Sequence, residues 1–159
     1  LGDVYKRQPK TYTSAKKVVL KKPTRKGYAF KGWYTNSNYT KKITSIKKGS
    51  KKNYTVYAKW SKVKVKKTTG LKVTNTKGKN LVVKYSKVSG AKGYQITYAT
   101  NSKFTKSKKV VNTTKRTKTI KKLKKGKTYY VRVRAYKKDS TGRKVYGKYS
   151  KVMKVKITK

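Results

Sequence analysis

The chain has 159 residues, of which 50 are Lys or Arg and only two are Asp or Glu, so its formal net charge is +48. It contains no His and no Cys, which excludes Ser–His–Asp and Cys–His catalysis, a disulfide framework and thiolate metal ligation. Its 15 Tyr and its frequent Val, Ile and Thr favour thin β-sheets over a thick helical core and predict an all-β or mainly β chain.

The first eight residues differ in composition from the Lys-, Thr- and Tyr-rich sequence that follows. This segment, LGDVYKRQ, holds Asp3, one of the two acids of the chain. Its last six residues resemble the in-frame translation of a transposase adapter used in sequencing libraries. Residues 1–8 are therefore expected to be a non-native scar and are left out of the fold prediction, with a natural N-terminal arm as the alternative. On this interpretation the protein continues upstream of Pro9, and any export signal lies outside the chain.

Two strand-like pieces stand between residues 9 and 60. The segment 23–34, PTRKGYAFKGWY, brackets an aromatic run with Gly, and the segment 53–60, NYTVYAKW, alternates between two faces. Alternation with a period of two between Gly, Asn and Ser clusters is the pattern of a half-buried strand. We therefore expect a small β-rich module here.

The same two segments, with ITSIKKGS at 43–50, resemble the Listeria–Bacteroides repeat, also called the internalin B-type repeat. The resemblance implies a β-grasp-like module of bacterial surface proteins, with Trp33 and Trp60 as structural residues. Family members carry an earlier strand and a Gly-rich turn, which this chain lacks ahead of residues 9–13. We therefore expect 9–60 to be a truncated repeat that is only marginally stable by itself, because a missing neighbour leaves a strand edge unpaired.

Residues 61–68 are expected to form a linker. The stretch SKVKVKKTT is polar and basic with Val at alternate positions, which allows either an extended connection or a short strand. The texts on its two sides do not repeat one another. The chain is therefore divided into a module at 9–60 and a second module at 69–159.

The second module contains three strongly alternating segments. NLVVKYSKV and GYQITYAT each place apolar side chains on one face, and TYYVRVRAY places Val and Ala inward and its two Arg outward. Strands at this spacing, separated by Gly, Asn and Ser, predict a β-sandwich of about a hundred residues. Residues 69–159 are expected to fold alone.

VSGAKGYQITY at 88–98 and LKKGKTYYVRVRAY at 123–136 resemble a fibronectin type III domain in the Lys-rich form common in Gram-positive anaerobes. In that frame Leu123, Gly126 and Tyr129 match the tyrosine-corner pattern, in which a Tyr hydroxyl bonds to nearby backbone. Tyr85 stands where the family usually has a core Trp. These four residues are expected to be structural.

No catalytic, cofactor or metal site is expected. Acid–base catalysis near neutral pH needs His, Glu or Asp, and after the first eight residues Asp139 is the one acid left. This excludes a carboxylate pair for glycoside hydrolysis and a cluster of metal ligands within the chain. Asp139 lies in the loop KKDSTGRK, where an Asp favours a turn.

Exposed aromatic residues on a basic surface are candidate stacking platforms for sugars or single-stranded nucleic acid. For each of them, cross-strand pairing that stabilises a sheet is the competing interpretation and the favoured one. The candidates are Trp33, Tyr34, Tyr39, Tyr57, Tyr130, Tyr136 and Tyr146.

The charge predicts anionic partners. Lys outnumbers Arg by 44 to 6, which suits sequence-blind attraction to a polyanion better than base reading by Arg forks. Anionic cell-wall polymers or acidic glycans are the expected partners, and nucleic acid is expected to bind only non-specifically. A compositional habit with no dedicated partner is the alternative. No run approaches the ~20 apolar residues of a membrane helix, so membrane insertion is not expected.

These features predict a non-catalytic pair of monomeric modules on the surface or in the wall of a Gram-positive bacterium, acting as an adhesive or spacer element. The alternative is a pair of accessory modules of a larger secreted enzyme, a wall hydrolase or glycosidase, whose catalytic domain lies elsewhere. A nucleic-acid-binding protein ranks last.

Overall fold

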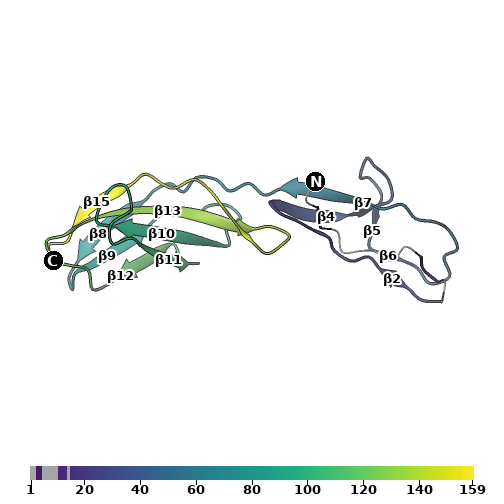
Figure 1. Cartoon of the computed structure of the whole chain (residues 1–159), viewed down its shortest axis with the longest axis horizontal. Coiled ribbons are helices and arrows are strands. Elements are labelled where there is room, and N and C mark those ends of the chain that lie inside the picture. Colours follow the sequence, from purple (N-terminus) through teal and green to yellow (C-terminus); the bar gives the residue numbers. More distant parts are fainter. Residues whose placement is uncertain (1–2, 5–10, 14) are drawn as a thin grey trace. The chain divides into compact units, whose positions relative to one another are not determined.

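The structure, a computed structural model, describes residues 3–4, 11–13 and 15–159. Every regular element in these residues is a β-strand (Figure 1), which confirms the predicted all-β class. The chain divides into two compact units. The first unit comprises Leu1–Val63 with Lys138–Arg143, and the second comprises Lys64–Lys137 with Lys144–Lys159.

The first unit is built from short strands in three small sheets. β1 pairs with β3, β2 pairs with β6, and β4 lies between β5 and β7, all antiparallel. Most of these strands are only two residues long, so backbone pairing by itself holds little of the unit together. Their bounds are β1 Asp3–Val4, β2 Val18–Val19, β3 Thr24–Arg25, β4 Tyr28–Tyr34, β5 Lys42–Ile43, β6 Ser45–Ile46 and β7 Tyr57–Lys62.

A β-bulge in β4 creates the aromatic cluster of this unit. The register with β7 shifts between Phe30 and Gly32, and Gly32 has a φ of 137°. Residues three apart on a regular strand face opposite sides, but the extra residue of the bulge shifts this alternation by one. Phe30 and Trp33 therefore lie on the same side, with ring centroids 5.6 Å apart. The Trp60 ring of β7 lies 5.5 Å from Phe30. Both Trp residues expected to be structural therefore lie around one Phe.

The second unit has the two sheets of a β-sandwich. One sheet has the order β12-β9-β8, and the other has the order β11-β10-β13-β14, with β15 also pairing with β13. The bounds are β8 Lys72–Thr76, β9 Asn80–Lys84, β10 Gly93–Ala99, β11 Lys109–Thr113, β12 Thr117–Ile120, β13 Thr128–Lys138, β14 Lys144–Tyr146 and β15 Met153–Lys156.

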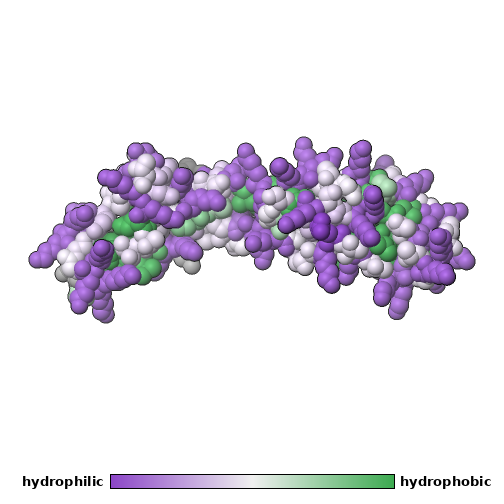
Figure 2. All heavy atoms as spheres, turned by 180° about the vertical axis from the view of Figure 1, so that it is seen from behind, coloured by the Kyte–Doolittle hydropathy of each residue, from purple (hydrophilic) through white to green (hydrophobic). Residues whose placement is uncertain are grey.

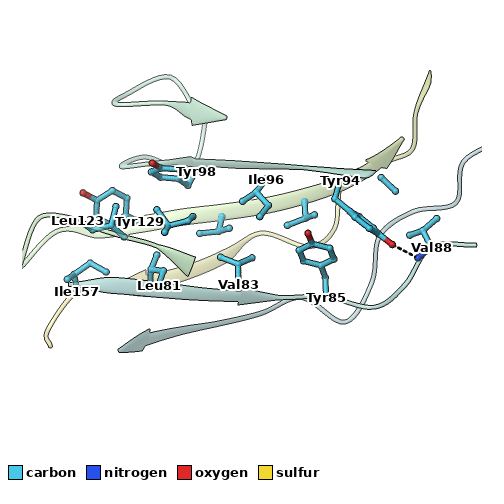
Figure 3. Close-up of a cluster of buried hydrophobic side chains, with 14 residues drawn as sticks. Leu81, Val83, Tyr85, Val88, Tyr94, Ile96, Tyr98, Leu123, Tyr129 and Ile157 are labelled. Carbon is cyan, nitrogen blue, oxygen red and sulfur yellow. Dashed lines mark hydrogen bonds between the residues drawn. The ribbon is translucent and has the colours of Figure 1, made fainter. Parts of the chain in front are cut away.

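Inward-facing side chains of both sheets form one core (Figure 3). Leu81 and Val83 of β9 are fully buried, as are Ile96 of β10 and Val131 and Val133 of β13. Leu81 and Val83 are two residues apart, and so are Val131 and Val133, because alternate residues of a strand share a face. Burying a side chain of this size stabilises the fold by about 1.5–3 kcal/mol, so this core is the main source of stability of the second unit.

Tyr hydroxyls are anchored to backbone at the edges of that core. The amide of Val88 donates to the Tyr94 hydroxyl at 2.9 Å (Figure 3). The Tyr85 hydroxyl donates to the Lys115 carbonyl at 2.7 Å. Burial, reinforced by the neighbouring Tyr94, raises the pKa of Tyr85 above its ordinary value. Tyr85 therefore remains a protonated donor at physiological pH.

The segment between the two modules belongs partly to each unit. Ser61 and Lys62 are the last residues of β7. Beyond the unit boundary, Val65 packs against the sandwich core and Thr68 is fully buried. The Thr69 carbonyl accepts a hydrogen bond from the Ser86 amide at 3.0 Å. The stretch expected to be a linker is thus ordered, and its second half contributes to the sandwich.

Candidate functional site

In the described part of the chain, no group of three or more His, Cys, Asp or Glu side chains is placed to hold a metal ion. A search of the same residues finds no helix with the length and apolarity needed to cross a membrane. The features with possible binding chemistry are therefore the loop of Asp139, the exposed aromatic residues and the cationic surface.

The carboxylate of Asp139 closes its own loop. It accepts hydrogen bonds from the amides of Thr141 and Arg143 at 2.8 and 3.1 Å, and from the amide of Gly27, in the same unit, at 2.8 Å. Burial acts to raise the pKa of Asp139, but these bonds and one from the Thr141 hydroxyl together lower it. An acid held ionised in this way is a structural acceptor and is poorly suited to proton transfer near neutral pH.

Two of the predicted stacking candidates are buried, and Tyr34, Tyr130 and Tyr146 are half-buried. Trp33 is buried, and its indole Nε1 donates to the Lys21 carbonyl at 2.9 Å. Tyr136 is also buried, with its ring centroid 5.9 Å from that of Tyr146. These residues are part of the packing, as the competing interpretation expects.

Tyr39 and Tyr57 are the two most exposed aromatic candidates, each with 38% of its surface accessible. The Tyr39 ring packs edge-on against Tyr34 with centroids 5.5 Å apart. The Lys59 ammonium lies 5.7 Å from the ring centroid of Tyr34 and 5.7 Å from that of Tyr39. This cluster leaves part of an aromatic surface open beside a cation.

The loop that presents Tyr39 occurs again in the second unit. TNSNYTK at 35–41 joins β4 to β5, and TNSKFTK at 100–106 joins β10 to β11. In each loop the aromatic residue has a positive φ, 56° at Tyr39 and 54° at Phe104. In each loop, the side-chain oxygen of the Asn, Asn36 or Asn101, accepts hydrogen bonds from the backbone amides of the Thr and the Lys that end the loop sequence. The two halves thus share one loop conformation, although they were expected not to repeat one another, and its aromatic residue is exposed at Tyr39 and buried at Phe104.

An alternating stack of rings and guanidinium groups lies on the second unit. We call it the arginine–aromatic ladder, and it consists of Phe104, Arg132, Tyr149, Arg134 and Tyr146. The Arg132 Cζ lies 4.1 Å from the Phe104 ring centroid and 3.9 Å from that of Tyr149. The Arg134 Cζ lies 3.8 Å from the Tyr146 centroid and 4.7 Å from that of Tyr149.

Gln95 fixes the ladder to the sheet. Its Oε1 accepts a hydrogen bond from the Arg134 Nε at 2.9 Å and one from the Tyr149 hydroxyl at 3.5 Å. Its Nε2 donates to the Tyr146 hydroxyl at 3.3 Å. Gln95 and Arg134 are directly paired between β10 and β13. One amide side chain therefore orients three members of the ladder.

The sequence predicted that Arg132 and Arg134 face outward, but it gave no indication that they are stacked. Phe104 and Tyr149 lie 28 and 17 residues from Arg132 along the chain, and only the fold brings the three together. One signal was available in the composition. Two of the six Arg of a Lys-rich chain stand two positions apart on one strand, which indicates that these positions require a guanidinium rather than any cation.

Cationic side chains cover much of the remaining surface. Figure 2 shows hydrophilic side chains over both units on the face it displays, with smaller hydrophobic areas between them. Most of the lysines are exposed. With one acid outside the first eight residues, the acids of the chain can neutralise only a small part of this charge.

The described residues form a two-sheet sandwich and a second, smaller unit, and all their regular elements are strands. The protein is therefore built from small β-modules. Residues 66–148 match the family model of the fibronectin type III domain, and residues 2–59 match that of the Listeria-Bacteroides repeat domain. The chain therefore belongs to the fibronectin type III family, preceded by a repeat of the second kind, which confirms both resemblances and their order. Such modules are typical of bacterial surface and secreted proteins and are typically non-catalytic.

The repeat match begins within residues 1–8, the segment expected to be an adapter scar. Six of those eight residues lie outside the described part of the chain, and the backbone of Asp3–Val4 pairs with β3 as β1.

Several solved structures are similar to this chain. The FN1–FN3 domains of chicken CNTN1 match with 20% identity and a TM-score of 0.51, over 66% of this chain and 35% of that one. A fibronectin type III-like protein from Clostridium thermocellum matches with 23% identity and a TM-score of 0.46, over 58% and 92%. The sixth fibronectin type III domain of a human protein matches with 17% identity and a TM-score of 0.49, over 62% and 90%. No curated protein matches the chain.

Proposed function

We propose that this chain is a non-catalytic pair of modules of a Gram-positive surface or secreted protein, and that it associates through its cationic surface with anionic wall polymers or acidic glycans. In this role the modules space or attach other parts of the protein at the cell wall. The observation that carries the proposal is the formal net charge of +48, from 50 Lys and Arg and only two acids, because so large an excess of cations attracts external polyanions.

The distribution of the cations supports this proposal. Exposed Lys side chains occur in both units, so attraction does not depend on one pocket. Such attraction acts over a screening length of ~8 Å at physiological ionic strength. The polymer must therefore lie close to the protein surface, as it does in a cell wall.

The test is co-sedimentation of the full chain with purified Gram-positive walls, before and after teichoic acid is removed. The proposal predicts binding at low salt, a loss of most of it when the phosphate polymer is stripped, and a loss on raising salt. The matched control is the same chain with its lysines acetylated, because acetylation removes the charge and leaves the backbone unchanged. Equal binding of the acetylated chain, or no binding to either wall preparation, contradicts the proposal.

A further inference from the structure

The arginine–aromatic ladder contains two cations whose donors are mostly unused. A guanidinium carries five N–H donors. In the described residues, the one hydrogen bond made by the side chains of Arg132 and Arg134 is that from the Arg134 Nε to Gln95. Among the residues whose side chains are described, the one acid is Asp139, and its carboxylate is occupied by the amides of Gly27, Thr141 and Arg143. Both Arg residues keep part of their surface exposed.

Two buried polar atoms lie on the strand pair that carries the ladder. Thr97 Oγ1 and Arg132 Nε are buried and have no hydrogen-bond partner among the described residues. Thr97 and Arg132 are directly paired between β10 and β13. Buried unsatisfied polar groups destabilise a fold, and a native structure that retains them at one place requires an explanation. Stabilisation of the sheet alone does not provide that explanation.

The geometry suits a linear polymer of phosphates. Arg132 and Arg134 are two residues apart, and the rise of a strand places their positions about 6.6 Å apart. Six single bonds join neighbouring phosphates across a three-carbon polyol, and an extended backbone of six bonds spans about 7 Å. Each planar guanidinium group can donate two parallel hydrogen bonds to two oxygens of one phosphate. Because the aromatic rings already hold the two guanidinium groups in place, the Arg side chains lose little conformational freedom on binding.

The same stacking argues against single-stranded nucleic acid. Sequence-tolerant binding of single strands relies on aromatic faces that are open to the bases. In the ladder, Tyr149 has a guanidinium against it from both Arg132 and Arg134, and Tyr146 and Phe104 each have one. The cations thus take up stacking surface on all three rings, which favours a polymer without bases.

We propose that the arginine–aromatic ladder is a binding site for a base-free polyol-phosphate chain, in which Arg132 and Arg134 each hold one of two successive phosphates. This inference rests on the proposed function and adds a defined site to the diffuse attraction of the lysines. It distinguishes guanidinium recognition from charge alone.

The test measures binding of the full chain to purified poly(glycerol phosphate) teichoic acid at low ionic strength. The R132K/R134K variant keeps the net charge but replaces both forks, and it is expected to bind about tenfold more weakly. The matched control, K84Q/K118Q, removes two charges from exposed positions of the β12-β9-β8 sheet and is expected to change affinity less than about twofold.

The outcomes separate the two proposals. Unchanged binding by R132K/R134K overturns the ladder site and leaves the diffuse association intact. No binding by the wild-type chain contradicts the proposed function itself. An equal loss on polygalacturonate overturns the assignment to phosphate, and an equal loss on oligothymidylate overturns the assignment to a base-free chain.

A measurement on the unmutated chain covers the case in which R132K/R134K fails to fold. The Nε–Hε resonances of Arg132 and Arg134 are followed by NMR while the polymer is added, with exposed Arg116 as the internal control. The site predicts shifts that saturate at Arg132 and Arg134 before Arg116 responds. Uniform, small shifts at all three contradict it.

Discussion

The backbone amide of Lys124 donates a hydrogen bond to the hydroxyl oxygen of Tyr129 at 3.2 Å, and the ring of this Tyr is buried in the sandwich core. The Y129F substitution keeps the ring and removes only the acceptor. Because the Lys124 amide then loses its partner, the free energy of unfolding is expected to fall by about 1 kcal/mol. Urea unfolding of the full chain measures this difference.

Tyr130 is the matched control for that prediction. It is the next residue on β13, and its ring faces the opposite side, with the Lys154 ammonium 5.9 Å from its centroid. The Y130F substitution is expected to change stability by less than about 0.5 kcal/mol. An equal effect of the two substitutions would show that the Tyr129 hydroxyl has no special role.

The loop shared by the two units gives a paired prediction. The Asn101 side chain accepts the amides of Thr105 and Lys106 at 3.0 and 2.9 Å, and these bonds hold Phe104 against Arg132. The N101A substitution is expected to destabilise the second unit by about 1 kcal/mol and to shift the Nε resonance of Arg132 in NMR spectra. The equivalent N36A substitution should leave that resonance unchanged. A shift with N36A, or none with N101A, would disprove the assigned role of the loop.

Where the sandwich begins can be tested by truncation. Val65 and Thr68 pack into the second unit although they lie in the stretch expected to be a linker. A fragment beginning at residue 64 is therefore expected to be more stable than one beginning at 69, by about 1–3 kcal/mol for the lost apolar burial. Thermal unfolding of the two fragments measures the difference. Equal midpoints would mean that residues 64–68 add nothing to the fold.

Asp139 predicts acid sensitivity of a stated sign. Its hydrogen bonds lower its pKa below the ordinary value of 3.8. The stability that the carboxylate contributes is therefore fully present above the unfolded pKa and is lost as the pH falls through the folded pKa. The D139N variant is expected to be less stable than the wild type at neutral pH, and the two should converge in strong acid. Unfolding midpoints across this pH range measure the effect, and a constant difference would contradict it.

Alternation along the strands predicted the sandwich core well. The alternation of NLVVKYSKV places Leu81, Val83 and Tyr85 on one face, and all three are buried. Residues two apart on a strand share a face, so an apolar residue at every second position predicts one buried face. The bulge at Gly32 could not be predicted in this way. It depends on how β4 pairs with β7, which is a property of two strands and not of either segment alone.

The ladder shows the same limit at the candidate site. Its two Arg were placed outward by the alternation of β13, whereas Phe104 comes from a loop and Tyr149 follows β14. No local pattern connects these residues. The repeated TNS sequence, in contrast, is present at 35–37 and 100–102, but so short a match between two otherwise different modules does not by itself predict a shared loop conformation.

In the proposed function, charge attracts this chain to wall polyanions. The most direct test is the affinity of the full chain for isolated teichoic acid across a series of salt concentrations. Neutralisation of many phosphates by cations releases counterions, so the logarithm of the affinity should fall linearly and steeply with the logarithm of the salt concentration. An affinity that does not change with salt, or an absence of binding at the lowest salt, would contradict this electrostatic attraction.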